Sequence, residues 1–382
     1  MRTAILLTVL IAASADADLV SKRIDSSGVR AMGGVTAAAE SMAGAAMENK
    51  SLSIIALGID LRGSLSVGLE AYGWVMDAMD FKDNLSLADM VVQRGKLVDL
   101  ASRVPRAFDL WGHVDVARFQ FGSKRLGAFM VGAYAEGLAG VRLDLPDPDS
   151  IRVVGQEIDI GGPVTMVETA GLGDVGGTLG YGRVFGLPKG LSLAAGAQVR
   201  IFHRWLVRSY RVTAAARISE AGGIDVPDFS HETGVGGTTS LSSILMLGDR
   251  FVDARVGLEV GGIGAVSYAN GMERETANFA VGAVVRPLAS IGFRRLEVGT
   301  ELRAEEGGNP SWHIGSSIAW GGRWLSFSPR IGGIIMDRRM FGEARNVFTG
   351  GFTATLGIVH LAGVVELYDG GYITDLTLGL GN

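Results

Sequence analysis

The chain has 382 residues, a formal net charge of −5 at pH 7 and no cysteine. The missing cysteines exclude disulfides, thiolate metal sites and a cysteine nucleophile. The nearly balanced charge, without a basic stripe, excludes a nucleic-acid-binding class. Glycine is the outlier, with 57 residues in a chain where an average usage of about 7% would give far fewer.

The first residues have the pattern of a secretory signal peptide. Arg2 supplies a positive charge, Ala4 to Ala13 form a short apolar run, and Ala15-Asp16-Ala17 matches the small-residue cleavage motif. The apolar run is shorter than the roughly 20 residues of a membrane-spanning helix. We therefore predict export with cleavage after Ala17, so that residues 1–17 are the signal peptide.

Two segments after the signal differ from the rest of the chain. Residues 18–50 are rich in small side chains and show neither helical nor strand periodicity. Near 81–104, Ser86 is an expected N-cap, apolar residues follow at helical spacing, and Pro105 ends the pattern. We predict a separate N-terminal segment at 18–50, followed by a β domain at 51–382 that contains one short helical insertion.

From Asp109 onward, apolar side chains alternate with polar ones. Such alternation indicates strands with one apolar and one polar face, and in a membrane barrel the polar face lines the lumen. Two stretches, near 250–260 and 295–304, carry charges of both signs on the polar face. Two explanations account for this pattern equally well. The charges could form a salt-bridge ladder that fills the barrel, or they could line a polar lumen that contacts a plug or solute. The lumen-lining candidates are Asp253, Arg255, Glu259, Arg295, Glu297, Glu301 and Arg303.

The fold class that we predict is all-β, a transmembrane antiparallel up-and-down β-barrel. Three features favour it over a soluble β protein: the export signal, strands near the roughly 9–11 residues that a tilted spanning strand needs, and a final strand that can close the ring. At about 20–25 residues per strand and connection, the chain gives about 12–14 strands, and 14 is preferred.

No motif predicts an enzyme. Residues 171–176 match G-x-G-x-x-G, but no helix pattern follows, so we interpret them as a glycine-rich turn. His113 and Asp115 share one strand face and are interpreted as polar lumen groups, because a catalytic pair needs a nucleophile nearby. A barrel hydrolase is the least favoured hypothesis, since no nucleophile–base spacing is recognised. We expect no catalytic residue, no metal site and no cofactor.

Residues 29–38, with the sequence VRAMGGVTAA, resemble the segment that opens mature outer-membrane barrels of the FadL/TodX class. The related PorV-like and conjugal-transfer TraF-like barrels share this segment. A short helical insertion after the first strand and repeated glycine-punctuated strands, as at 190–196, are also similar. The resemblance implies that residues 18–50 fold into the barrel as a hatch, whose mobile element is formed by Arg30, Ala31, Met32, Gly33 and Gly34.

Two functions follow from this resemblance. The first is a passive channel for small hydrophobic solutes, gated by the hatch, in the outer membrane of a Gram-negative-type bacterium. The alternative is a PorV-like structural or assembly barrel with a filled lumen, whose helix near 81–104 docks a partner protein. The expected partners are therefore outer-membrane lipid, small hydrophobic solutes or a protein, and not nucleic acid.

Overall fold

The computed structural model describes residues 43, 46, 52–63, 107–123, 126–143, 152–154, 157–159, 161–162, 164–219, 222–225, 230–248, 253–287, 296–306, 310–321, 324–337, 345–368 and 371–381. Nearly all of them form strands, as the alternation predicts. The predicted signal peptide, the hatch residues Arg30 to Gly34, the helix near 81–104 and Arg295 lie outside the described residues. No helix in the described part is long and apolar enough to cross a membrane.

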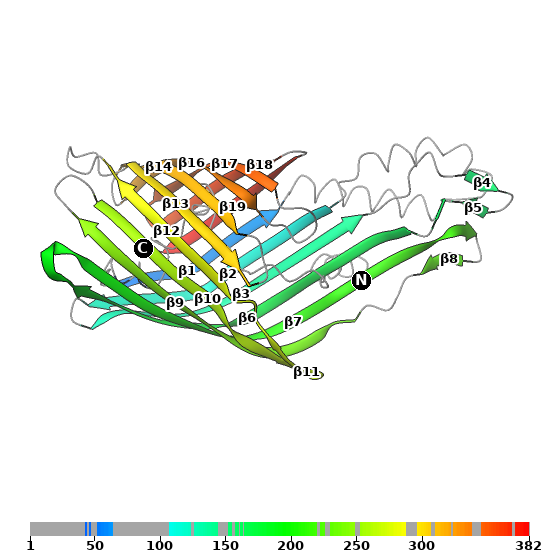
Figure 1. Ribbon diagram of the computed structural model, residues 1–382, viewed down its shortest axis with the longest axis horizontal. Helices are drawn as coiled ribbons and strands as arrows, with labels where there is room; N and C mark the ends of the chain where they lie inside the picture. The colour runs from blue at the N-terminus through cyan, green and yellow to red at the C-terminus, as the bar shows by residue number, and fades with distance from the viewer. Residues whose placement is uncertain are drawn as a thin grey trace.

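The described strands form one antiparallel sheet of 19 strands. Five of them are short, and the other fourteen run up and down in chain order, each bonded to the next (Figure 1). Because β1 pairs with β2 on one side and with β19 on the other, the ladder returns to its first strand. The predicted all-β, antiparallel up-and-down architecture is thus confirmed. The fourteen are β1 (Leu52–Gly63), β2 (Ala107–Ser123), β3 (Gly127–Leu143), β6 (Val164–Gly186), β7 (Ser192–Ser219), β9 (Glu232–Gly248), β10 (Asp253–Tyr268), β12 (Asn278–Arg286), β13 (Leu296–Glu305), β14 (Ser311–Ile318), β16 (Leu325–Asp337), β17 (Arg345–Leu356), β18 (Val359–Tyr368) and β19 (Gly371–Gly381).

The five short strands sit beside or beyond the ends of the long ones. β11 (Gly271–Arg274) pairs with β10, and β15 (Trp320–Gly321) pairs with β16. β4 (Arg152–Val154) pairs with β5 (Glu157–Asp159), and both β5 and β8 (Gly222–Asp225) pair with the far part of β7. In Figure 1, β6 and β7 extend well beyond the other strands toward these short pieces. We call this projecting part, β4, β5 and β8 with the ends of β6 and β7, the hairpin extension.

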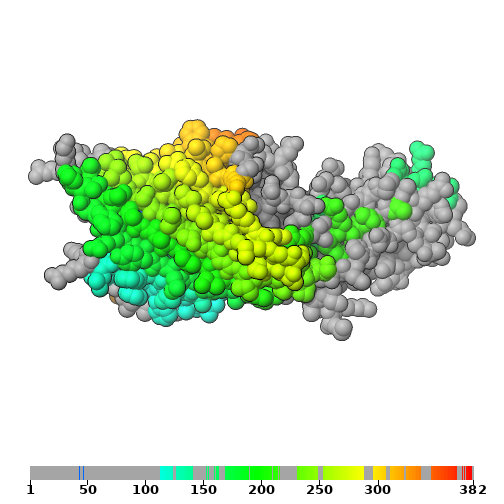
Figure 2. Space-filling view, turned by 60° about the horizontal axis from the view of Figure 1, so that its bottom comes forward, coloured from blue at the N-terminus to red at the C-terminus, as the bar shows by residue number. Residues whose placement is uncertain are grey.

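The two faces of the barrel wall differ in polarity. On β10, Val256 and Leu258 are 41% and 39% exposed, whereas Arg255 and Glu259 lie on the opposite, inner face. Large apolar side chains are exposed in the same way on other strands of the described wall. Figure 2 shows one face of this wall, coloured by residue number. Leaving so much apolar area in water is unfavourable, at about 25 cal/mol per Å². The outer face is therefore suited to lipid.

Aromatic side chains gather on the outer face near both ends of the strands. Trp312 and Trp320 are both exposed and lie eight positions apart, about 27 Å along an extended chain. At a tilt of about 35–45° this distance corresponds to about 20 Å across the membrane, close to the apolar band of outer-membrane barrels. Phe121 and Phe129, stacked at 5.3 Å, and Phe327 and Phe352, stacked at 5.9 Å, add rings near the shorter turns.

The two ends of the barrel carry connections of different length. At the end where β19 finishes, β6 is joined to β7 through the short 3-10 turn Pro188–Gly190 (η2), and β17 is joined to β18 by residues 357–358. At the other end, residues 64–106 connect β1 to β2, and residues 144–163 lie between β3 and β6. Short turns face the periplasm in outer-membrane barrels, so we call the end with the short turns the periplasmic end and the opposite one the external end.

The sequence interpretation of residues 171–176 as a turn is wrong, because these residues lie inside β6. Glycine is needed there for close approach: a Cβ atom added at Gly176 would overlap the carbonyl oxygen of Ile201 on β7. The same is true at Gly264 on β10, where an added Cβ would overlap the carbonyl oxygen of Gly237 on β9. Tight contact between neighbouring backbones therefore explains part of the high glycine content.

We predict that Gly264→Ala destabilises the barrel by about 1–3 kcal/mol, because the methyl group forces the backbones of β9 and β10 apart. Gly350→Ala is the matched control, since an added Cβ at Gly350 meets no heavy atom within 4 Å. The temperature at which each folded barrel loses its compact mobility on an SDS gel measures the difference. Equal transition temperatures for the two variants would contradict this account of Gly264.

Candidate functional site

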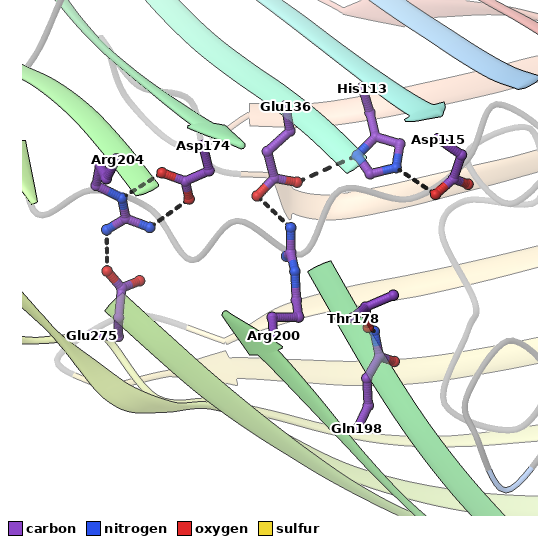
Figure 3. Close-up of polar contacts among 9 residues, drawn as sticks. All are labelled: His113, Asp115, Glu136, Asp174, Thr178, Gln198, Arg200, Arg204 and Glu275. Carbon is purple, nitrogen blue, oxygen red and sulfur yellow. Dashed lines mark hydrogen bonds and ion pairs between the residues drawn. The ribbon is translucent and has the colours of Figure 1, made fainter. Parts of the chain in front are cut away.

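A buried polar group on the inner face surrounds Arg204 of β7. Its guanidinium binds Asp174 of β6 through two hydrogen bonds, Nε to Oδ1 at 2.7 Å and Nη2 to Oδ2 at 2.6 Å, and its Nη1 binds Glu275, which follows β11 (Figure 3). Arg204 and Asp174 are almost fully buried. Buried charges are tolerated only when paired and hydrogen-bonded, so this triad is a bridge that holds three segments of wall together.

A second chain of charges runs from β7 to β2 on the same face. Arg200 Nη2 lies 2.7 Å from Glu136 Oε1 on β3. Glu136 Oε2 lies 3.4 Å from His113 Nδ1, and His113 Nε2 lies 3.5 Å from Asp115 Oδ1. The ring of His113 is thus placed between two carboxylates, as Figure 3 shows. His113 and Asp115 lie on one face of β2, as expected. Glu136 on β3 and Arg200 on β7 could not be recognised as their partners, because the sequence pattern of one strand does not show which strands are its neighbours.

An apolar patch lies between these charged groups, which we call the aromatic patch. Guanidinium groups cover two of its rings, with Arg200 4.1 Å from the ring centre of Tyr134 and Arg204 4.6 Å from that of Phe202. Cation–π contacts of this kind favour aromatic side chains beside arginine. The patch is made of Tyr134, Leu172, Phe202, Leu206, Val266 and Tyr268, all buried.

The patch depends on glycines in β9. Gly234 and Gly236 lie between Phe202 on β7 and Tyr268 and Val266 on β10, and a Cβ at either glycine would come within 2.9 Å of these side chains. Because β9 has no side chain there, β7 and β10 contact each other across it. The space left by these two glycines also lets Arg204 reach Glu275. The glycines at alternate positions of β9 are the sequence signal from which this contact could have been anticipated.

The lumen-lining candidates fall into two groups in the structure. Arg286 of β12 binds Asp253 at 2.9 Å and also Glu297, and Arg255 Nη2 lies 3.7 Å from Asp253 Oδ2. Sequence reasoning missed Arg286, which joins the candidates of β10 to those of β13.

The remaining candidates lie further along the same face of the wall. On β13, Arg303 Nε lies 2.5 Å from Glu301 Oε1. Glu259 lies on the inner face of β10, and Arg295 is outside the described residues. Opposite charges pair in the first group and between Glu301 and Arg303 in the second, so these pairs leave little net field to select an ion.

Ser311 and His313 of β14 form a hydrogen-bonded pair that the sequence search did not recognise. Ser311 Oγ lies 2.8 Å from His313 Nε2. Residues two positions apart lie on the same face of a strand, so the S-x-H order could have indicated this pair in the sequence. Among the described residues, no group of three or more His, Asp or Glu side chains is arranged to hold a metal ion.

Two residues of the predicted N-terminal segment are described, and both are buried and helical. Ala43 packs against Ala194 of β7 and Ile244 of β9. Its backbone N–H donates to Ser242 Oγ on the inner face of β9 at 3.1 Å. Because Ala194 is the third residue of β7, this contact lies near the end with the short turns.

No protein-family model and no curated protein sequence matches the chain. Among solved structures, the toluene transporter TbuX of Ralstonia pickettii is similar with a TM-score of 0.46 and 11% identity, over 95% of this chain and 98% of that one. The β domain of the Bordetella autotransporter BrkA gives 0.34 and 14%, over 87% and 99%. Pseudomonas aeruginosa OccK9 gives 0.30 and 8%, over 87% and 98%. Scores this low carry no argument about function.

We predict that Arg204→Met lowers the free energy of unfolding by about 3–5 kcal/mol, because it leaves the buried carboxylate of Asp174 without its cation. The control is Arg274→Met, which removes an exposed pair with Glu306 and is expected to cost less than about 1 kcal/mol. Urea unfolding of the barrel in lipid vesicles measures both. Similar midpoints for the two variants would show that the buried triad contributes no more than an exposed pair.

Proposed function

We propose that the chain is an outer-membrane barrel that lets small hydrophobic solutes cross passively, with residues 18–50 acting as a hatch inside the ring. The observation that carries the proposal is the position of Ala43, which is fully buried against the inner face and hydrogen-bonded to Ser242. A segment that precedes the first strand and is held inside the ring blocks passage until it moves.

The spacing along the chain supports a segment that crosses the lumen. Ala46 and Leu52 are six positions apart, so the residues between them span at most about 20 Å. β1 is separated from β7 by β2, β3 and β6 around the wall. Ala43, on β7 and β9, and the start of β1 therefore lie on separate parts of the wall, both near the end with the short turns. In this proposal, Arg30 to Gly34 belong to the movable part, and glycines there permit rearrangement at little steric cost.

The aromatic patch supports a hydrophobic solute. Phe202 lies eight positions beyond Ala194 on β7, about 27 Å further toward the external side. A solute from outside would pass this part of the wall, where Arg200 and Arg204 cover two rings of the patch, before it reached the hatch. Five of the described lumen-lining residues form ion pairs, so they add little net charge to attract a particular ion: Asp253, Arg255, Glu297, Glu301 and Arg303.

The hairpin extension favours a second candidate function, the docking of a partner protein. β7 has 28 residues, more than twice the roughly 9–11 of a spanning strand, and β4, β5 and β8 add strands to its outer part. Passive diffusion through the lumen does not require such a projection. In this alternative the lumen stays filled, and the connection at 64–106 and the hairpin extension form the docking surface.

The first test is single-channel conductance of residues 18–382 in a planar bilayer, compared with a chain that lacks residues 18–50. We expect brief or no openings from the mature chain and a steady conductance after the deletion. If both chains are silent although folded, the lumen is filled and the docking function takes its place.

A second test fixes the segment in position. The chain has no cysteine, so Ala43→Cys with Ser242→Cys introduces the only pair. We expect a disulfide under oxidising conditions that stops the uptake of N-phenyl-1-naphthylamine by intact cells that carry the chain in their outer membrane, and recovery on reduction. The single-cysteine variants are the controls. Uptake that continues through the crosslinked barrel would contradict gating by this segment.

A further inference from the structure

The inner face of β13 and β14 brings together four side chains with complementary chemistry. Ser311 Oγ is hydrogen-bonded to His313 Nε2 at 2.8 Å. In the antiparallel register, Arg303 is opposite Ser311 and Glu301 is opposite His313. Residues directly opposite in such a pair have Cβ atoms about 4.5–5.5 Å apart, so the four groups share one small area of wall.

The four side chains differ in exposure in a way that suits reaction at the serine. His313 and Glu301 are 2% and 1% exposed, whereas Ser311, the first residue of β14, remains partly exposed on the external side. The direction of the bond between Oγ and Nε2 depends on the tautomer of the imidazole: with the ring proton on Nδ1, Nε2 accepts from the hydroxyl. This is the state in which histidine can accept a proton from a serine.

From this arrangement we propose that Ser311 and His313 form a nucleophile–base pair that hydrolyses carboxylic esters reaching the external mouth of the barrel. The pair does not involve the hatch or the solute that crosses the membrane. A barrel hydrolase was the least favoured hypothesis from the sequence, but the order serine–x–histidine places a nucleophile next to a base on β14.

The reaction balances with water as the only co-reactant. Oγ of Ser311 attacks the ester carbonyl carbon while its proton passes to His313 Nε2, and the carbonyl oxygen becomes an oxyanion. Collapse breaks the bond to the alkoxy group, which leaves as an alcohol with the proton from Nε2. Water then repeats the sequence on the acyl-serine, which releases the carboxylic acid and restores both side chains.

Two further residues assist this reaction by their charge. The guanidinium of Arg303, bound through Nε to Glu301, lies on the strand opposite Ser311 and stabilises the oxyanion. The carboxylate of Glu301 lies opposite His313 and stabilises the imidazolium that forms during the attack. Glu301 is a positioning residue in this scheme, since it does not touch the ester.

The experiment treats the full chain, refolded in phosphatidylcholine vesicles, with a fluorophosphonate probe and, separately, with p-nitrophenyl acetate. We expect a probe adduct that maps to Ser311 and turnover of the ester above background. Ser311→Ala should abolish both. His313→Gln should lower the rate by about 10²–10⁴-fold, the usual contribution of a general base. His313→Gln also keeps the serine, so it tests the pair if Ser311→Ala folds poorly.

The matched control is Ser317→Ala, which removes a hydroxyl six positions along the same inner face of β14 and should leave labelling and turnover unchanged. Compact mobility on an SDS gel verifies that each variant is folded. Absence of an adduct at Ser311, labelling without turnover, or turnover that survives Ser311→Ala would each overturn the proposal.

Discussion

The structure depends on one constraint, which is that every backbone N–H and C=O group inside a lipid bilayer must have a partner within the protein. An unpaired group in hydrocarbon costs several kcal/mol, so strands can cross a membrane only in a closed ring. Here β1 meets that requirement by pairing with both β2 and β19. Once the ring is closed, the two-residue period assigns every side chain either to lipid or to the interior.

A register shift in the ladder exchanges the residues that face lipid with those that face the interior. On β10 the inner face is occupied by odd-numbered residues such as Arg255 and Glu259, and beyond the register shift between Val260 and Ile263 by even-numbered ones such as Val266. Gly262, with φ of 69°, supplies the backbone conformation that this bulge needs. Without the extra residue, Val266 and Tyr268 would face lipid and the aromatic patch would lose one side.

The alternation was readable in the sequence because it is local. Asp253, Arg255 and Glu259 lie on one strand, and their common face needs no knowledge of neighbours. The partners of these charges were not readable, because Arg286 meets Asp253 only through the pairing of β10 with β12. Glu275 meets Arg204 across a strand that glycine leaves bare. The segment 171–176 was misinterpreted for a related reason, since its glycines serve the approach of β7, which is distant in sequence.

The distribution of charge inside the ring bears on what such a wall can do. Arg200, Arg204, Arg286 and Arg303 each contact at least one carboxylate. Pairing on this scale offsets part of the cost of placing charges in a barrel, and it also weakens the field by which a channel would discriminate among ions. Selectivity in the proposed transport must then come from shape and from apolar contact. The aromatic patch at the external half and the small-residue contact of Ala43 at the other end are the features of the described wall that offer those two properties.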